Sequence, residues 1–194
     1  SVVYLAIDNK LEGIICINDP VRKEARDVIE ELKKLGIENV IMLTGDSESG
    51  AKSSAEALGI TEYRSQVLPE DKASIVESLK EEGRTIIMVG DGINDSPVLA
   101  LADVGVSMGG VGANSAIEAS DVVIMTDSID KINEAIEISK KTSKIIKQNL
   151  IFAITTKIVI LVLSTIGIAG MWQAVFADVG VTLITILNTL RILK

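Results

Sequence analysis

Histidine is absent from this 194-residue chain, and cysteine occurs once, as Cys16. A lone cysteine can form neither an intrachain disulfide nor a thiolate cluster, and the lack of histidine excludes catalysis by an imidazole of this chain. A metal site built from these residues alone would therefore use oxygen ligands, unless other chain segments contribute.

Charged residues are scarce in the last part of the chain and mostly acidic before it. The net charge is −8 in total, but residues 149–194 carry +2 and residues 1–148 carry −10. An acidic region without a basic stripe argues against nucleic acid as a partner. A bound phosphate would instead need local devices such as a helix N-terminus, a lysine or Mg²⁺.

No signal peptide and no initiating methionine are found at Ser1. Because a strand pattern begins at the first residues, we expect the chain to be a fragment of a longer protein. Apolar residues make up 47% of the chain, and the mean hydropathy of +0.39 is high for a soluble protein.

Apolar periodicity predicts an alternation of strands and helices. Residues 2–19 are expected to form a hairpin with its turn at residues 8–10, and Asp19-Pro20 to begin a helix that reaches Leu35 and ends at Gly36. The further expected strands are residues 39–44, 84–92 (buried), 103–109 and 121–125, and the further helices are residues 47–58, 68–83 and 93–102.

Such an alternation predicts a parallel sheet with helices on both faces, and ligands outside the carboxyl ends of its strands. Thr44-Gly45-Asp46, Gly90-Asp91-Gly92 and the glycine-rich stretch after Met108 are expected at that edge. The stretch MGGVGAN resembles part of a dinucleotide-binding loop, but its spacing fails and no acidic ribose partner follows. We interpret it as a backbone turn.

Oxygen ligands gather in the string VGDGINDSPVL. Asp91 ends a strand, Asp95 begins a helix, and Asn94 lies beside it. Hard oxygen donors in this number suit Mg²⁺ bridged to a phosphate. Taken singly, the acids could equally belong to a loop with a helix N-cap.

Two other segments offer groups for a phosphoryl oxygen. The hydroxyl of Thr44 and the backbone N–H groups of Gly45 and Asp46 are suitable donors, although a plain turn in which Asp46 caps the next helix is an alternative. Lys72 begins a helix and could neutralise phosphate charge, although a solvated surface lysine is the ordinary interpretation of one lysine.

From residue 128 onward the pattern becomes that of a membrane hairpin. A lysine-bearing helix leads into two apolar stretches, about residues 150–169 and 171–190, each long enough to span a bilayer. Lysines before the first stretch and Arg191 and Lys194 after the second place both ends in the cytoplasm. A buried helical hairpin in a soluble core is the alternative.

Lys157 and Asp178 stand out because each lies near the middle of an apolar stretch. A charge in a membrane helix is costly and indicates a functional site, the alternative being that both side chains reach the surface. If the helices turn near Gly170, Lys157 lies about 20 Å from that turn along its helix, and Asp178 lies about 12 Å from it. Their side chains lean in opposite directions, so direct contact would require helix tilt or a third group.

Together, MLTGDS, LPEDK and VGDGINDSPVLALADVGVSMG resemble the haloacid-dehalogenase-like phosphoryl-transfer fold, and more closely the phosphorylation domain of P-type ATPases. The resemblance implies ATP and Mg²⁺ as cofactors. It also implies that Asp91 binds Mg²⁺ and that Asn94 and Asp95 complete that site. Thr44 and Lys72 would hold the phosphoryl group, with Gly45 and Asp46 alongside.

The apolar stretches narrow this resemblance to one class. NLIFAITTK and MWQAVFADVGVTLITILNTLR resemble the last two helices of zinc-, cadmium- and lead-transporting pumps. In that class Asp178 would bind the transported metal, and Lys157 would supply a counter-charge at the same site. The Tyr-Asn and Met-x-x-Ser-Ser patterns of copper pumps do not occur in these stretches.

One departure from the family is the absence of its phosphorylated aspartate, which lies in an Asp-Lys-Thr-Gly-Thr string. We expect that string, the rest of the nucleotide domain, the actuator domain and the other membrane helices to precede Ser1. The expected organisation is residues 1–18 from the nucleotide domain, 19–127 from the phosphorylation domain, 128–148 as a linking helix and 149–194 as a transmembrane pair.

The resulting hypothesis is that the intact pump exports Zn²⁺, Cd²⁺ or Pb²⁺ through an aspartyl phosphate. It would be a multi-pass protein of the plasma (bacterial inner) membrane with its phosphorylation domain in the cytoplasm, and this chain alone would be inactive. One alternative is a non-catalytic, membrane-tethered regulatory module. Another is a small phosphatase that uses its own aspartate, which we disfavour because Asp91 is assigned to the metal.

Overall fold

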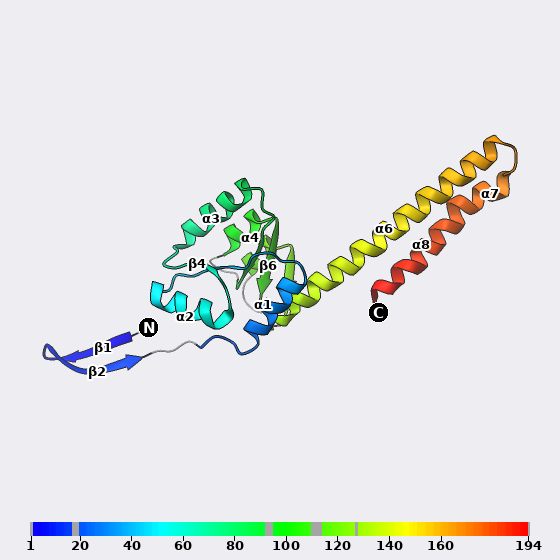
Figure 1. Ribbon diagram of the computed structural model, residues 1–194. Helices are drawn as coiled ribbons and strands as arrows, with labels where there is room; N and C mark the ends of the chain where they lie inside the picture. The colour runs from blue at the N-terminus through cyan, green and yellow to red at the C-terminus, as the bar shows by residue number, and fades with distance from the viewer. Residues whose placement is uncertain (1, 17–19, 92–94, 110–113, 127, 194) are drawn as a thin grey trace. The chain divides into compact units, whose positions relative to one another are not determined.

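A computed structural model describes residues 2–16, 20–91, 95–109, 114–126 and 128–193 (Figure 1). The chain divides into two units, Ser1–Lys131 and Ile132–Lys194. The division falls inside one long helix, α6 (Asp130–Thr165). Each unit therefore has its own internal packing.

The predicted hairpin is present at the start of the chain. Strands β1 (Val2–Ile7) and β2 (Lys10–Cys16) pair antiparallel, and Asp8 and Asn9 form the turn with φ values of 47° and 60°. Positive φ at both turn residues is typical of the two-residue turn whose twist matches that of the strands.

The first helix begins later than the sequence predicts. Helix α1 (Ala25–Lys34) starts five residues after Pro20, and the carbonyl of Arg22 accepts the N–H of Ala25 at 3.1 Å in a turn before it. The prediction was wrong here because proline suits a turn as well as a first helical position. Asp19 lies outside the described residues, whereas the predicted end holds, with Gly36 at φ 85°.

A small sheet packs against α1 and α2 (Glu48–Leu58). Strands β3 (Ile41–Leu43) and β4 (Glu62–Arg64) pair in parallel. Their core consists of Ile29, Ala55 and Ile60, with Val40, Met42, Leu58 and Tyr63 packed against it. Strand β4 was not predicted, because three residues are too few to show an alternating pattern.

A second parallel sheet has the order β5 (Ile87–Gly90), β6 (Val104–Met108) and β7 (Val122–Ile124). Helices α3 (Pro69–Glu81), α4 (Ser96–Leu101) and α5 (Asn114–Ala119) accompany it. The prediction of parallel strands is confirmed. The described strands nevertheless form two parallel sheets rather than one.

Strand β5 was expected to be buried, and this expectation is wrong. Ile87 and Val89 are each 38% exposed. The reason is that β5 has a described partner, β6, on one side only. The middle strand β6 is the buried one, and a Cβ on Gly105 would lie 2.5 Å from the carbonyl oxygen of Leu99, so α4 packs closely on it.

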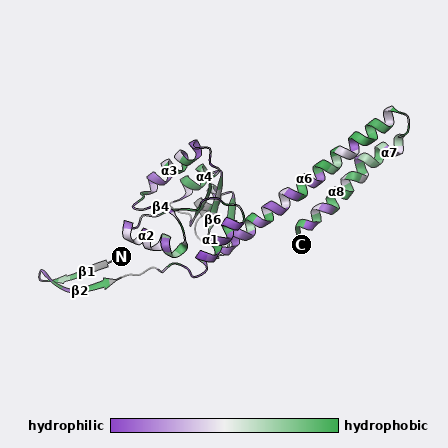
Figure 2. Ribbon diagram, viewed as in Figure 1, coloured by the Kyte–Doolittle hydropathy of each residue, from purple (hydrophilic) through white to green (hydrophobic). Residues whose placement is uncertain are grey.

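The second unit contains two helical segments that are long and apolar enough to cross a membrane. The first is α6; the second, Met171–Leu193, joins α7 (Met171–Val175), a π-helical turn η1 (Phe176–Gly180), α8 (Val181–Thr189) and a 3₁₀ turn η2 (Leu190–Leu193). Figure 2 shows α6 changing from polar to apolar along its length.

These segments do not resemble a hairpin buried in a soluble core. Only 6% and 11% of their most apolar windows are buried, whereas a core helix of a soluble protein is mostly buried. The first helix ends at Thr165, four residues before the predicted end of the stretch, and Gly167 turns the chain with φ 77°.

Candidate functional site

Lys72 and Asp95, two of the predicted site residues, form a partly buried ion pair. Lys72 Nζ lies 2.7 Å from Asp95 Oδ1, and the two side chains are 19% and 10% exposed. Lys72 lies in the first turn of α3, and Asp95 is the residue directly before α4. Lys72 is therefore not the solvated surface lysine that its sequence context also allowed.

The Asp95 side chain lies against the end of β5, where Gly90 leaves room for it because it has no side chain. A Cβ built on Gly90 would lie 2.7 Å from Asp95 Oδ2 and 2.9 Å from Asp95 Cβ. Any larger residue would therefore displace this carboxylate. Glycine is required here for close approach, a reason separate from any backbone strain.

The Thr44-Gly45-Asp46 segment follows β3 and is bound to the connection between β4 and α3. The backbone N–H of Thr44 donates to the carbonyl of Arg64, and the N–H of Val67 donates back to the carbonyl of Thr44, both at 3.0 Å. Because α3 begins at the next residues, this connection links the Thr44 segment to the helix that carries Lys72.

Asp46 does not cap helix α2, contrary to the alternative drawn from sequence. The hydroxyl of Ser47 accepts the N–H of Gly50, at 3.4 Å, and so makes the cap. The N–H of Asp46 donates instead to Thr44 Oγ1 at 3.1 Å, which fixes the threonine hydroxyl beside the turn. The Asp46 side chain is exposed and therefore open to a ligand.

Asp91 lies directly after β5 and is exposed, and Asn94 lies outside the described residues. Carboxylate oxygens at Asp91 and Asp95 are the donor type that Mg²⁺ prefers, so the donor set fits this ion. However, Lys72 engages Asp95 Oδ1, and a metal ion would compete with it for that oxygen. Among the described residues, no three acidic, cysteine or histidine side chains gather closely enough to hold a metal.

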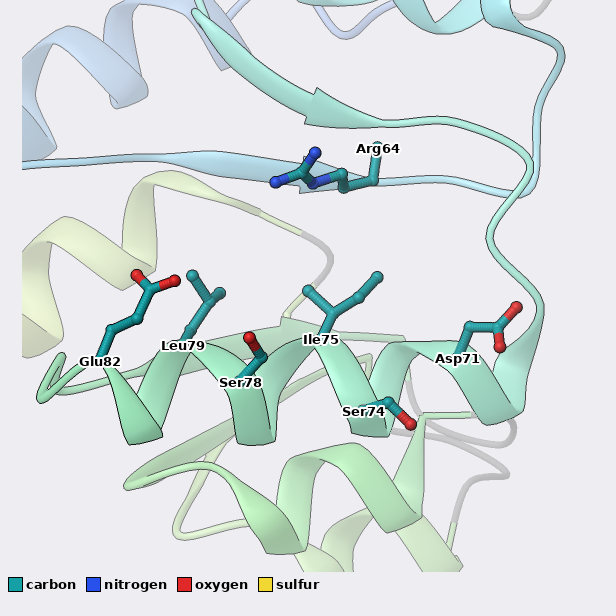
Figure 3. A pocket seen from close by; sticks show the side chains of 7 residues that line it. All are labelled: Arg64, Asp71, Ser74, Ile75, Ser78, Leu79 and Glu82. Carbon is teal, nitrogen blue, oxygen red and sulfur yellow. The ribbon is translucent and has the colours of Figure 1, made fainter.

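An open pocket of about 340 Å³ lies between β4 and α3 (Figure 3). Ile75 and Leu79 of α3 point toward Arg64 of β4 across it. The pocket contains none of the predicted site residues, although Asp71 on its wall adjoins Lys72. It is a gap between the layers of the first unit, and it does not enclose the predicted phosphoryl site.

Glu48 joins the start of α2 to β4. Its carboxylate accepts hydrogen bonds from the Ser65 hydroxyl and, at 2.9 Å, from the Tyr63 hydroxyl. The Ser65 bond, followed by the Tyr63 bond, holds the pKa of Glu48 below its ordinary value, and the same carboxylate raises the pKa of Tyr63. This cluster ties the segment after Asp46 to the strand that precedes α3.

In the second unit, Lys157 and Asp178 meet directly across the two helices. Lys157 Nζ lies 3.3 Å from Asp178 Oδ1, beside a pocket of about 270 Å³ that both residues line. The sequence suggested that opposite side-chain directions would prevent this contact without tilt or a third group. The structure has the contact, and Asp178 lies in the π-helical turn η1 rather than in a regular helix.

Two local features accompany the π-helical turn. Gly180 has no side chain, and a Cβ there would lie 2.7 Å from the ring of Phe176. The hydroxyl of Thr182 donates to the carbonyl of Asp178 at 2.6 Å. Single π-helical turns within α-helices often occur at functional sites.

Sequence reasoning missed a set of polar contacts nearer the chain's C-terminus. Asn149 Nδ2 donates to the carbonyl of Thr185 and to the hydroxyl of Thr189, and Asn188 Nδ2 donates to Asn149 Oδ1. The signal was available, since asparagine side chains within apolar helices hydrogen-bond to neighbouring helices.

Comparison with known proteins decides the family. Residues 2–103 match the family model for haloacid dehalogenase-like hydrolases. The chain belongs to that family. This match agrees with the parallel sheets and with the candidate residues at the ends of β3 and β5.

Individual relatives are metal-transporting ATPases. Over its whole length the chain is 46% identical to the "Cadmium, zinc and cobalt-transporting ATPase" of Bacillus subtilis and 47% identical to the "Zinc-transporting ATPase" of Synechocystis. It covers 28% and 27% of those proteins. The chain thus corresponds to little more than a quarter of each relative, and its resemblance to heavy-metal P-type ATPases is confirmed.

A solved structure is similar to this chain. The crystal structure of a zinc-transporting PIB-type ATPase in its E2.Pi state matches with a TM-score of 0.88 and 36% identity. The match covers all of this chain and 31% of the other. The predicted fold class, a haloacid-dehalogenase-like parallel sheet followed by two long apolar helices, is confirmed.

Proposed function

We propose that this chain is part of an ATP-driven exporter of Zn²⁺ or Cd²⁺, and of Pb²⁺ as a chemically similar ion. The observation that carries the proposal is the Lys157–Asp178 contact, an ion pair between two apolar helices in a chain with transporting relatives. Two charges placed within apolar segments require a functional reason, because exposure to lipid would be costly.

The first unit would supply part of the phosphoryl-transfer site. Mg²⁺, held by Asp91 and Asp95 with Asn94, would neutralise charge on the transferred phosphoryl group of ATP. Lys72 would contribute a second positive charge, and the Thr44 hydroxyl with the N–H groups of Gly45 and Asp46 would orient phosphate oxygens. The link from Thr44 through the β4–α3 connection to Lys72 supports a common role.

The phosphorylated aspartate would come from a segment outside this chain. Strands β3 and β5 are edge strands of two parallel sheets, and the candidate residues follow both of them. A further parallel strand between them would join the sheets and would end beside Thr44 and Asp91. Such a strand would also cover Ile87 and Val89, which are half-exposed.

The second unit would supply part of the metal path, with Asp178 as an oxygen ligand and Lys157 as its partner when the metal has left. Other ligands would come from membrane helices outside this chain. A fixed ammonium would favour release of a divalent cation by repulsion. The lipid bilayer would surround the two helices, with the first unit on the cytoplasmic side of the plasma membrane.

The proposed organisation follows from these roles. Residues 1–18 would be the end of the nucleotide domain, and residues 19–127 would form the C-terminal half of the phosphorylation domain. Residues 128–148 would link that domain to the membrane, and residues 149–194 would be the transmembrane pair. Against a non-catalytic module stands the Lys72–Asp95 pair beside β5, and against a small phosphatase stands the membrane hairpin.

The test uses the full-length protein that contains this chain, reconstituted in liposomes. Asp178→Ala is expected to abolish zinc-stimulated ATP hydrolysis, and Lys157→Ala is expected to retain zinc binding but to slow release and dephosphorylation. Zinc stoichiometry and turnover are measured for both, with Ile138→Ala outside the site as a control. Full zinc-stimulated turnover in a folded Asp178→Ala protein would refute the proposal.

A further inference from the structure

The two long helices of the second unit are hydrogen-bonded to each other near the end that is remote from their turn. Asn149 Nδ2 donates to the Thr185 carbonyl at 3.1 Å and to the Thr189 hydroxyl at 3.0 Å. Asn188 Nδ2 donates to Asn149 Oδ1 at 2.7 Å, and Arg191 donates to Asn188 Oδ1 at 3.0 Å. We call the side chains of Asn149, Asn188 and Thr189 the asparagine clasp.

The asparagine clasp and the Lys157–Asp178 pair lie along the same seam between the helices. Lys157 follows Asn149 by eight residues, and Asp178 precedes Asn188 by ten. Eight helical residues correspond to about 12 Å of axial distance. The second helix has ten residues rather than eight between its two contacting residues. The π-helical turn η1, with its i→i+5 bonds, overlaps the start of that stretch.

Apolar contacts alone would hold this register weakly. Lipid is as apolar as the helix surfaces, so sliding one helix along the other costs little unless directional bonds oppose it. A slip of one residue moves a side chain by about 1.5 Å along the axis and rotates it by about 100°. Such a slip would separate Asp178 from Lys157, whose contact distance is 3.3 Å.

We propose that the asparagine clasp is a positioning element that sets the axial register of the two helices and so brings Lys157 opposite Asp178. This inference rests on the proposed role of that pair in metal export. Asparagine suits the task because its neutral amide both donates and accepts, as Asn149 does here. A buried asparagine fixes register in coiled coils for the same reason.

Register is measured by disulfide cross-linking in the full chain, in detergent micelles and in liposomes. In a Cys16→Ser background, cysteines replace Ser164 and Ala174, which line one pocket from opposite helices. Asn149→Leu removes all the bonds of that side chain, and its cross-linking rate is expected to fall about threefold or more, the effect of losing one average interhelical hydrogen bond. An unchanged rate would overturn the proposal.

Thr185→Val is the matched control. It removes a hydroxyl that donates within its own helix, to Thr182, but it retains the backbone carbonyl that Asn149 uses. Its cross-linking rate is expected to stay at the wild-type value, and a fall equal to that of Asn149→Leu would overturn the proposal. Helix content from circular dichroism shows whether each variant folds.

Asn188→Asp decides the question if Asn149→Leu does not fold. It keeps the shape of the side chain and an acceptor for Arg191, but it cannot donate to Asn149 when ionised. A slower cross-linking rate supports the proposal, and a wild-type rate overturns it.

Zinc-stimulated turnover of the full-length protein separates the inference from the proposed function. Asn149→Leu is expected to lower turnover and to raise the zinc concentration for half-maximal activity about threefold or more, while Thr185→Val leaves both unchanged. Slower cross-linking with an unchanged zinc response would refute the transport role of the Lys157–Asp178 pair and leave the register role intact. An unchanged cross-linking rate would refute the register role whatever the zinc response.

Discussion

Lys72 and Asp95 lie in an environment that their sequence neighbours do not reveal. Each is mostly shielded from water, and their charged atoms are 2.7 Å apart. Removing one partner from such a pair leaves a charge in a poorly solvated place, which costs more than the pair itself contributes. The pair therefore positions α3 against α4, and it keeps an ammonium and a carboxylate beside the end of β5.

We predict that Lys72→Ala destabilises the chain by about 3 kcal/mol, because the Asp95 carboxylate loses its partner. The double variant Lys72→Met with Asp95→Leu is expected to cost less than the sum of the single changes. The free energy of unfolding of each variant is measured by denaturant unfolding, with hydrogen exchange of the β5 and β6 amides as the probe. Additive effects would show that the two side chains do not interact.

The Lys80–Asp103 pair is a control for this prediction within the same unit. Its side chains are 34% and 35% exposed, so solvent screens the interaction. Lys80→Ala is expected to cost clearly less than Lys72→Ala. An equal cost would mean that burial does not govern these pairs.

At the scale of the element, helix α2 shows which residue ends the loop after β3. Ser47, with extended backbone, accepts the N–H of Gly50, while Asp46 belongs to the preceding turn. The helix ends equally clearly, because Gly59 adopts a left-handed conformation with φ 69°. The Thr44 segment is thereby separated from the helix that follows it.

Replacing the cap is expected to show this division of roles. We predict that Ser47→Ala lowers the free energy of unfolding by about 1 kcal/mol, the usual effect of losing an N-cap side chain. Asp46→Ala is expected to have a smaller effect on stability, since its side chain makes no cap bond. Thermal unfolding of both variants measures the difference, and the reverse order would return the cap to Asp46.

The start of strand β6 is held by Asp103 in a way that depends on pH. Asp103 accepts the N–H of Ile86 at 2.8 Å and pairs with Lys80 at 3.1 Å. The backbone bond first, and then Lys80, hold the pKa of Asp103 below its ordinary value. Because the folded-state pKa is depressed, this contribution to stability is present above the unfolded-state pKa of about 3.9 and is lost as the pH falls through the lower folded value.

We predict that Asp103→Asn lowers the unfolding temperature at neutral pH, and that the difference from wild type shrinks as the pH falls below about 4. The asparagine keeps an acceptor for Ile86 but has no charge for Lys80. Unfolding temperatures are measured from about pH 7 to about pH 3. A difference that stays constant over this range would contradict the assignment of the charge.

On the scale of the whole molecule, the two units differ in charge as well as in polarity. Residues 1–131 carry a net charge of −12, and residues 132–194 carry +4. The positive charges of the second unit lie mainly on α6 before its apolar part and at the end of the chain, where Arg191 and Lys194 are. This is the distribution that favours keeping both ends of a membrane hairpin in the cytoplasm.

Labelling with a membrane-impermeant maleimide tests that topology. In a Cys16→Ser background, we predict that a cysteine at Ile168, in the turn between the helices, is labelled in intact cells. A cysteine at Ser128, before α6, is expected to react only after permeabilisation. Labelling of both in intact cells, or of Ser128→Cys alone, would refute the predicted orientation.

Much of the fold could be predicted from local patterns. The hairpin β1–β2, the helix ending at Gly59 and the two apolar segments each depend on residues close together in sequence, as turn chemistry and apolar periodicity do. The start of α1 was misplaced and β4 was missed, because Pro20 fits two conformations and three residues show no period.

The candidate site could be predicted by residue type but not by contact. Thr44, Lys72, Asp91 and Asp95 were chosen from the sequence, and their roles stay predictions. The contacts depend on how the chain packs, which the residue types do not reveal. Lys72 pairs with Asp95, and Gly90 lies against the same carboxylate. Ser47 rather than Asp46 caps α2.

The same division applies to the second unit. The sequence by itself determined that Lys157 and Asp178 are charges within apolar helices, because composition and length are local properties. Only the tertiary structure decided that they meet, because their contact is set by the register between two helices, with Asp178 placed in the π-helical turn η1. Register is a property of the pair, so neither helix specifies it alone.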